Sequence, residues 1–211
     1  MMIIIFSGYT APMDRQPTRK ELTHARIVET AARAIRRAGF QGVGVADIMK
    51  EAGLTHGGFY AHFASRDALL VEALEHAGQD SAATMARAMA SRRARGASPL
   101  RALVESYLSE AHLRAADTGC PVAALAGEMP HQASEVREAA AQRVRALIGL
   151  VQQALPGDAG AGGAEAVASQ LVGALQLARA LGDNAQGKAL LARSRESLLA
   201  LFDTPSPAPS P

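Results

Sequence analysis

Cysteine, aromatic residues and long apolar runs are all scarce in this sequence of 211 residues. It has one Cys and no Trp, and aromatic residues make up 4% of the chain. A single Cys excludes an intramolecular disulfide and is typical of proteins that work in a reducing compartment. The chain instead has 48% hydrophobic residues and is rich in the helix formers Ala and Leu. This composition predicts an all-α protein that buries a sizeable core.

The apolar opening MMIIIF is far too short to cross a membrane. It also lacks the basic region and the length of a secretory signal, so we expect a cytoplasmic protein without a membrane partner. Residues 1–17 are predicted to be a flexible arm, in which Met13 is an alternative start. The tail at residues 203–211 is rich in Pro and Ser and is predicted to be disordered.

Positive charge is concentrated in the first half of the chain. Residues 1–100 carry 13 Lys and Arg against 9 Asp and Glu, whereas residues 101–211 carry 9 against 11. A basic excess in one part of a protein favours an acidic partner such as nucleic acid for that part.

The stretch at residues 45–63, VADIMKEAGLTHGGFYAHF, has the pattern of a helix-turn-helix. Two short helices are predicted to meet at Gly53, which can adopt the positive φ that ends a helix, and Thr55 is placed to cap the second one. Apolar residues at helical spacing would pack the pair together: Ile48, Met49, Ala52, Leu54, Phe59 and Phe63. The second helix would then present its polar residues outward as a reader of DNA.

Gly57 and Gly58 are unusual inside the predicted reader helix, because each Gly costs roughly 1 kcal/mol relative to Ala in a helix interior. Their lack of side chains would let the backbone approach a DNA groove closely; alternatively, they merely extend the turn. Four further side chains are predicted to reach base edges or phosphates: Thr55, His56, Tyr60 and His62.

Helices are predicted on both sides of this motif. Thr18 and Glu21 match a capping box, and the helix that follows is expected to stop at Gly39. Its buried stripe is predicted to contain Leu22, Ile27, Ala31, Ala34 and Ile35. Its basic residues, Arg36 among them, are interpreted as a solvated face except near its N-terminal end. Ser65 would cap a further helix, with Arg66 in the first turn placed to bind phosphate.

Residues 26–76 carry five short motifs in order: A-x-x-x-I-x-x-x-G-F, V-A-D-I, A-G-L-T, F-Y-x-H-F and S-R-D-A-L-L. Together they resemble the N-terminal domain of the tetracycline-repressor (TetR) family of bacterial transcription regulators. The resemblance implies about nine helices: a three-helix DNA-binding domain at residues 18–66, and a long connector helix leading into a ligand-binding and dimerisation domain at residues 67–202. It also implies DNA contacts by Thr55, Gly57, Tyr60, His62 and Arg66. Gly44 and Arg66 depart from the usual hydroxyl cap and the common Lys.

In the second half, Cys120 stands just before Pro121 at a predicted helix start, where backbone N–H groups favour a thiolate. A Gly-Cys pair here resembles a subgroup of the family whose cysteine senses electrophiles or oxidants; alternatively, Cys120 is a small buried hydrophobe. Ser98 and Pro99 would begin a helix that runs to about Asp117. Candidates for lining an effector cavity are flexible or amphipathic residues: Met85, Met89, Tyr107, Cys120, Met129 and His131.

No catalytic, metal or cofactor site is predicted. Glu128 and His131 have the spacing of a di-iron ligand pair, but Pro130 interrupts the helix that such a pair needs. The Gly-rich loop at residues 156–163 follows no strand and lacks the spacing of a nucleotide-binding fingerprint.

Two helices, at residues 164–181 and 185–202, combine small residues with Leu and Val, which permits close helix packing. The family resemblance implies that they form the interface of a homodimer. The favoured function is therefore a homodimeric transcription repressor that binds a palindromic DNA operator and is released from it by a small molecule, an electrophile or an oxidant. The alternative is a helical small-molecule binding protein or enzyme without specific DNA binding.

Overall fold

The computed structural model describes residues 16–157 and 162–203. These residues form nine α-helices and two short 3₁₀ helices, and no strand occurs among them. The predicted all-α fold is therefore confirmed. Most of the predicted arm, part of the Gly-rich loop and nearly all of the predicted tail lie outside the described residues.

The N-terminal part contains the predicted helix-turn-helix. It consists of α1 (Arg19–Ala38), α2 (Val45–Glu51), the 3₁₀ helix η1 (His56–Ala61) and the first half of α3 (Arg66–Arg93). The capping box of Thr18 and Glu21 begins α1, and Gly39 and Gly53 both have positive φ. The buried stripe of α1 is as predicted except for Leu22, which is 58% exposed, since the buried residues of the helix begin at Ile27.

Seven elements make up the rest: α4 (Pro99–Tyr107), α5 (Glu110–Arg114), α6 (Pro121–Leu125), η2 (Met129–His131), α7 (Ser134–Ala154), α8 (Gly163–Leu181) and α9 (Ala185–Phe202). The single helix predicted from Pro99 to about Asp117 is wrong. It ends at Tyr107, and α5 starts separately because the Ser109 hydroxyl caps it by accepting the N–H of His112 at 3.1 Å.

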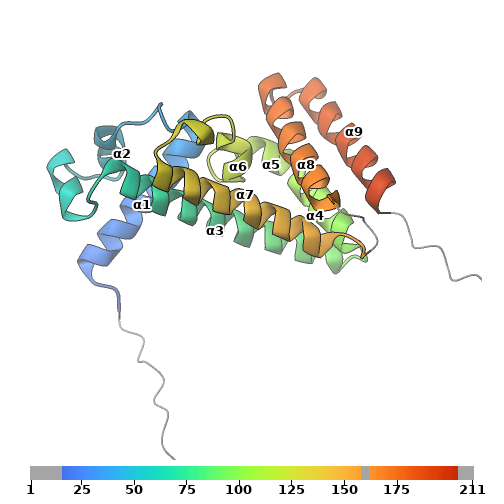
Figure 1. The fold of residues 1–211 in the computed structure, drawn as a ribbon, viewed down its shortest axis with the longest axis horizontal. Helices are drawn as coiled ribbons and strands as arrows, with labels where there is room; N and C mark the ends of the chain where they lie inside the picture. Colours follow the sequence, from blue (N-terminus) through green and yellow to red (C-terminus); the bar gives the residue numbers. More distant parts are fainter. Residues whose placement is uncertain (1–15, 158–161, 204–211) are drawn as a thin grey trace, which may run out of the picture.

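Figure 1 shows α3 and α7 side by side along the long axis of the molecule, with α1, α2 and η1 at one end and the α8–α9 pair at the other. Two buried apolar clusters hold these parts together. The first joins the helix-turn-helix to Leu125, Met129 and Val136 from the second half of the chain. The second lies among α3, α4, α6, α7, α8 and α9. The N-terminal part is thus packed against the second part, and is not attached only through α3.

Candidate DNA-binding surface and effector cavity

The predicted reader helix is a 3₁₀ helix of 6 residues and not an α-helix. Its hydrogen bonds join residues three apart, such as Gly58 N to Thr55 O at 3.1 Å and His62 N to Phe59 O at 2.9 Å. The predicted cap is also wrong, because the Thr55 side chain makes no capping hydrogen bond. Two adjacent Gly residues and the missing cap both disfavour an α-helix, which explains the tighter turn.

Thr55, His56, Gly57 and Tyr60 are all exposed on this turn, whereas Phe59 is buried beneath it. Tyr60 is 73% exposed, an unusual position for a large aromatic side chain in a folded protein. A Cβ atom added to Gly57 would meet no atom of the described chain within 4 Å. Internal packing therefore does not explain the absence of a side chain there, and the backbone of Gly57 is bare toward solvent.

His62 and Arg66, which were predicted to face DNA, are only partly exposed. The His62 ring lies 5.9 Å from that of His24 in α1, and its Nδ1 is buried with no hydrogen-bond partner among the described residues. Burial and the nearby charges of His24 and Lys20 lower the pKa of His62. The Arg66 guanidinium donates to the Phe40 carbonyl. Both side chains therefore have contacts within the domain as well as partial exposure, and their contact with DNA stays a prediction.

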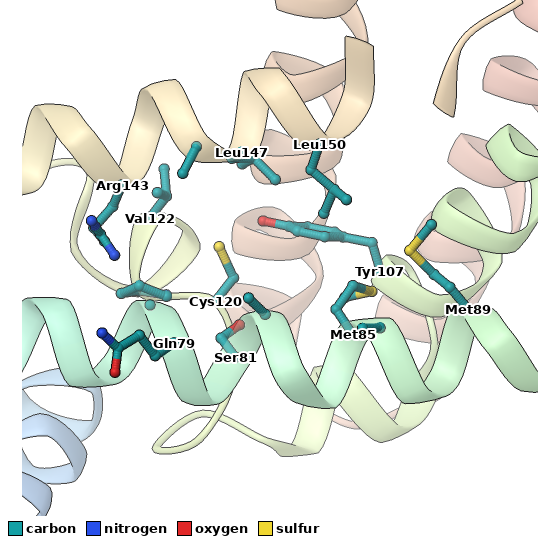
Figure 2. A pocket seen from close by; sticks show the side chains of 15 residues that line it. Gln79, Ser81, Met85, Met89, Tyr107, Cys120, Val122, Arg143, Leu147 and Leu150 are labelled. Carbon is teal, nitrogen blue, oxygen red and sulfur yellow. The ribbon is translucent and has the colours of Figure 1, made fainter. Parts of the chain in front are cut away.

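A cavity of about 590 Å³ lies between α3 and α7, with Tyr107 of α4 and the start of α6 closing its sides (Figure 2). Four of the predicted effector-binding residues line it: Met85, Met89, Tyr107 and Cys120. The structure adds others that the sequence pattern did not indicate, among them Gln79, Ser81, Val122, Arg143, Leu147 and Leu150. The walls are mainly apolar, and the volume is within the range of about 300–1,000 Å³ typical of small-molecule sites.

Met129 and His131 do not line this cavity, so that part of the prediction is wrong. Met129 is buried in the cluster that includes the helix-turn-helix, and His131 is exposed on the surface. The reason is Glu128, whose carboxylate accepts the N–H of Phe40 at 2.9 Å and so directs this segment against the end of α1. Among residues 16–157 and 162–203, no group of His, Cys, Asp and Glu is arranged to hold a metal ion.

His112 connects two residues of the cavity wall. Its Nδ1 lies 2.7 Å from the Tyr107 carbonyl, and its Nε2 accepts the backbone N–H of Cys120 at 3.0 Å. Only a neutral imidazole with its proton on Nδ1 can make both bonds. The pKa of His112 is lowered to about 4, mainly by burial and to a smaller extent by the charge of Arg179, whereas the hydrogen bond to the Tyr107 carbonyl opposes the shift. The ring is therefore neutral at physiological pH and fixes the backbone on both sides of the cavity.

The polar tips of Tyr107 and Cys120 both point into the cavity (Figure 2). Cys120 is 6% exposed, and the chain has no second Cys with which it could form a disulfide. The Tyr107 hydroxyl is buried, and no atom of the described residues hydrogen-bonds to it. Burial first, and the neighbouring Cys120 thiol second, raise the pKa of Tyr107 well above its usual value, although the two groups do not have hydrogen-bond geometry.

Arg36 links the cavity wall to the helix-turn-helix. Its guanidinium is buried, donates to Ala32 O at 3.0 Å and to Gly119 O at 3.2 Å, and lies 3.6 Å from the Asp80 carboxylate. Burial lowers the pKa of Arg36, and Asp80 opposes this effect. The interpretation of Arg36 as part of a solvated basic face is wrong. Val28, Ala32 and Arg36 are each four residues apart and lie on the buried side of α1. This spacing could have indicated from the sequence that Arg36 is buried.

A second link joins the two halves at Phe40, between α1 and α2. Its N–H donates to Glu128, and its carbonyl accepts from Arg66 at the start of α3. A Cβ atom on the preceding Gly39 would lie 2.2 Å from Glu128 Oε1, so a side chain at this position would displace the carboxylate. The backbone between α1 and α2 is thereby held from both sides.

At the far end of the molecule, α8 and α9 pack on each other and leave large apolar side chains uncovered. Leu177 is 60% exposed, Leu181 is 43% exposed and Leu201 is 65% exposed. Leu177 and Leu181 are four residues apart and so lie on one face of α8.

Comparison with known proteins agrees with this arrangement. Residues 27–73 match the family described as bacterial regulatory proteins, tetR family, and residues 96–193 match the tetracyclin repressor-like C-terminal domain. Among solved structures, the reduced form of NemR from Escherichia coli is similar, with a TM-score of 0.69, 20% identity, and coverage of 88% of this chain and 99% of that one. SCO4454, a TetR-family transcriptional regulator from Streptomyces coelicolor, has a TM-score of 0.63, 25% identity and coverage of 85% and 93%.

Curated relatives match over shorter segments. The HTH-type transcriptional regulator YerO of Bacillus subtilis is 39% identical over 51 residues, which are 24% of this chain and 18% of that protein. An HTH-type transcriptional regulator of Mycobacterium tuberculosis is 32% identical over 104 residues, 49% of this chain and 51% of that protein. The chain thus spans about half or less of the curated relatives that it matches. Within the described residues, no helix has the length and apolar character needed to cross a membrane.

Proposed function

The chain belongs to the TetR family of bacterial transcription regulators, and we propose that it is a homodimeric repressor that leaves a palindromic operator when an effector fills the cavity between α3 and α7. The main observation in support of the proposal is that one short segment, Gly119 and Cys120, contacts both the cavity and the helix-turn-helix. Cys120 forms part of the cavity wall, and the adjacent Gly119 carbonyl binds Arg36 of the helix-turn-helix.

DNA binding is assigned to the exposed turn of η1. Hydrogen-bonding side chains are exposed to solvent at Thr55, His56 and Tyr60. The backbone between His56 and Tyr60 has no side chain at Gly57 or Gly58. Such a turn suits contact with a DNA groove and its phosphates. His62 and Arg66 stay predicted contacts that would need to turn outward on binding, and until then they support the turn from within the domain.

Dimerisation is assigned to α8 and α9, whose exposed Leu residues would be buried against a second copy. A two-fold axis through these helices would let the two η1 turns of the dimer contact successive major grooves of one duplex, and a palindromic site would match that symmetry.

The mechanism is a shift between two conformations. An effector that binds one arrangement of α3, α6 and α7 more tightly than the other increases the population of that arrangement. The size of the shift is set by the difference between the two binding free energies. Arg36 of α1 binds Gly119, just before α6, and Phe40, just after α1, binds Glu128, just after α6, so a displacement of the cavity wall would be passed to the helix-turn-helix. The distance between the two η1 turns of the dimer then no longer fits the operator.

Cys120 gives the repressor a second route of release. The thiol faces the cavity, so a quinone small enough to enter can add to it, forming a carbon–sulfur bond while the thiol proton passes to the quinone oxygen. Cys120→Ser keeps the size of the side chain and should abolish release of DNA by the quinone, whereas release by a non-covalent effector should persist. Equal release of both proteins by the quinone would show that Cys120 is only a buried core residue.

A salt titration of binding to DNA from upstream of the protein's own gene tests the function. Affinity should fall steeply as salt rises, because each phosphate contact releases counterions. Absence of binding at low salt would contradict the proposal and favour a small-molecule binding protein or enzyme on the same helical scaffold.

A further inference from the structure

Arg143 is a cation at the wall of a mainly apolar cavity. Its side chain extends from α7 across Gly78 of α3, and a Cβ atom on Gly78 would lie 2.6 Å from both Cδ and Nη1 of Arg143. Gly78 therefore provides the space in which this side chain lies.

Arg143 is half-buried, yet no hydrogen bond or ion pair to it exists among the residues that the structure describes. Its neighbour Arg145, two residues along the same helix, donates to Glu138 at 2.8 Å. Other Arg residues that reach into the protein are also bound: Arg36 contacts Gly119 and Arg179 contacts the carbonyl of His112. A guanidinium that faces a cavity and is left without a carboxylate is free to bind an anion from outside the chain.

Tyr107 provides a second, independent indication that the ligand is polar in part. Its hydroxyl is buried, unpaired within the described chain and directed into the same cavity. A buried hydroxyl without a partner is unfavourable, and a polar atom of a ligand would satisfy it. Between Arg143 and Tyr107 the wall is formed by Leu147, Leu150 and Val122, which suit an apolar body.

We propose that the cavity binds an organic carboxylate with an apolar body, whose carboxylate pairs with Arg143 and whose further polar atom accepts from the Tyr107 hydroxyl. The planar guanidinium matches the two oxygens of a carboxylate, and the apolar wall removes the rest of the ligand from water. The assignment of this ligand as the effector rests on the proposed function, but its binding to the cavity does not.

Calorimetry on the full-length protein without DNA separates the contribution of the carboxylate to binding affinity from that of the apolar body. The probes are decanoate and 4-phenylbutanoate, each compared with its neutral amide. The wild-type protein should bind each acid at least about tenfold more tightly than its amide, the range of a charge-assisted hydrogen bond. Arg143→Gln should remove this preference and leave affinity for the amides unchanged. Arg145→Gln removes the same charge from an exposed position on the same helix and should keep the preference.

Decanoates with a hydroxyl at successive carbons test the second contact. One positional isomer should bind the wild-type protein more tightly than decanoate does, and Tyr107→Phe should remove that gain while leaving decanoate unaffected. Equal affinity for acids and amides, or no binding of either acid at millimolar concentration, would overturn the proposal.

The same acids added to the protein on its operator distinguish this inference from the proposed function. Binding of the acids without release of DNA would support the ligand class and contradict its role as effector. Release of DNA by the neutral amides as readily as by the acids would support the regulatory function and contradict the ligand class.

Discussion

Gly57 allows a test of the proposed DNA-binding turn. It either lets the backbone approach DNA closely or merely extends the turn, and the two roles predict different effects of Gly57→Ala on DNA affinity. A Cβ atom at this position meets nothing within 4 Å in the described chain, and φ is not positive there. Gly57→Ala should therefore leave stability unchanged or slightly raised, since Ala restricts the unfolded chain. Operator affinity should fall about tenfold or more if the backbone approaches DNA closely, as measured by a binding titration at fixed salt.

Gly53→Ala is the matched control for this change. Gly53 has φ of 70° and so tolerates a side chain poorly, although its Cβ would also meet no atom within 4 Å. Its replacement should lower the free energy of unfolding by roughly 1 kcal/mol. If Gly57→Ala lowers stability as much as Gly53→Ala does, or leaves DNA affinity intact, the turn is not a close DNA contact.

His112 makes the stability of the protein depend on pH in a calculable direction. Its pKa falls from 6.5 in the unfolded chain to about 4 in the native protein, so protonation favours unfolding. The stabilising contribution is complete above pH 6.5 and is lost as pH falls toward 4. Urea unfolding at constant protein concentration should show a loss of about 2 kcal/mol from His112 between pH 7.5 and pH 5.

The His112→Gln protein should be less stable at pH 7.5, because Cys120 N–H and the Tyr107 carbonyl lose their partner, but it should lose less stability on acidification. His131→Gln changes an exposed His and should retain the wild-type pH dependence. An unchanged pH dependence in His112→Gln would show that the buried imidazole is not the titrating group.

At the scale of elements, the link between α1 and the segment before α7 depends on the Glu128 carboxylate. Glu128→Ala removes the acceptor of the Phe40 N–H, whereas Glu128→Gln keeps an oxygen in the same place. The response to the effector is measured as the operator affinity without effector divided by the affinity with effector. If this contact transmits effector binding, Glu128→Ala should make that ratio about five- to tenfold smaller, which is within the usual range of coupling energies. Glu128→Gln should retain most of the ratio, and equal ratios in all three proteins would exclude this route.

The sequence predicted these elements unevenly, for reasons visible in particular residues. Capping residues determine helix starts locally, so Thr18, Ser65 and Ser98 were recognised correctly. The break after Tyr107 was missed because the run from Pro99 has continuous helical composition and only Ser109 marks the new start. The reader turn was predicted as an α-helix although Gly57 and Gly58 disfavour one.

Residues of the cavity could be predicted only in part. Met85, Met89, Tyr107 and Cys120 were chosen by side-chain type, but the same criterion selected Met129 and His131, which lie elsewhere. No sequence pattern indicated that Arg143 lines the cavity, because its position depends on the packing of α7 against Gly78 of α3. Long-range packing of this kind is not encoded in local spacing.

At the scale of the whole molecule, the proposed dimer interface on the exposed face of α8 can be tested directly. Leu177 and Leu181 are 60% and 43% exposed, so replacing both by Glu should not disturb the core of the chain. In a dimer the same changes would bury like charges against each other, which strongly opposes association. Light scattering should then give a mass near 21.9 kDa for the double variant and near twice that for the wild type.

Operator binding should weaken with the loss of the dimer, because a second half-site held at high effective concentration contributes a factor of about a hundred or more. Leu22→Glu alters a Leu that is 58% exposed at the other end of the molecule, and it should remain dimeric. A double variant that stays dimeric would place the interface elsewhere. A monomeric variant with undiminished operator affinity would contradict recognition of the operator by two linked η1 turns.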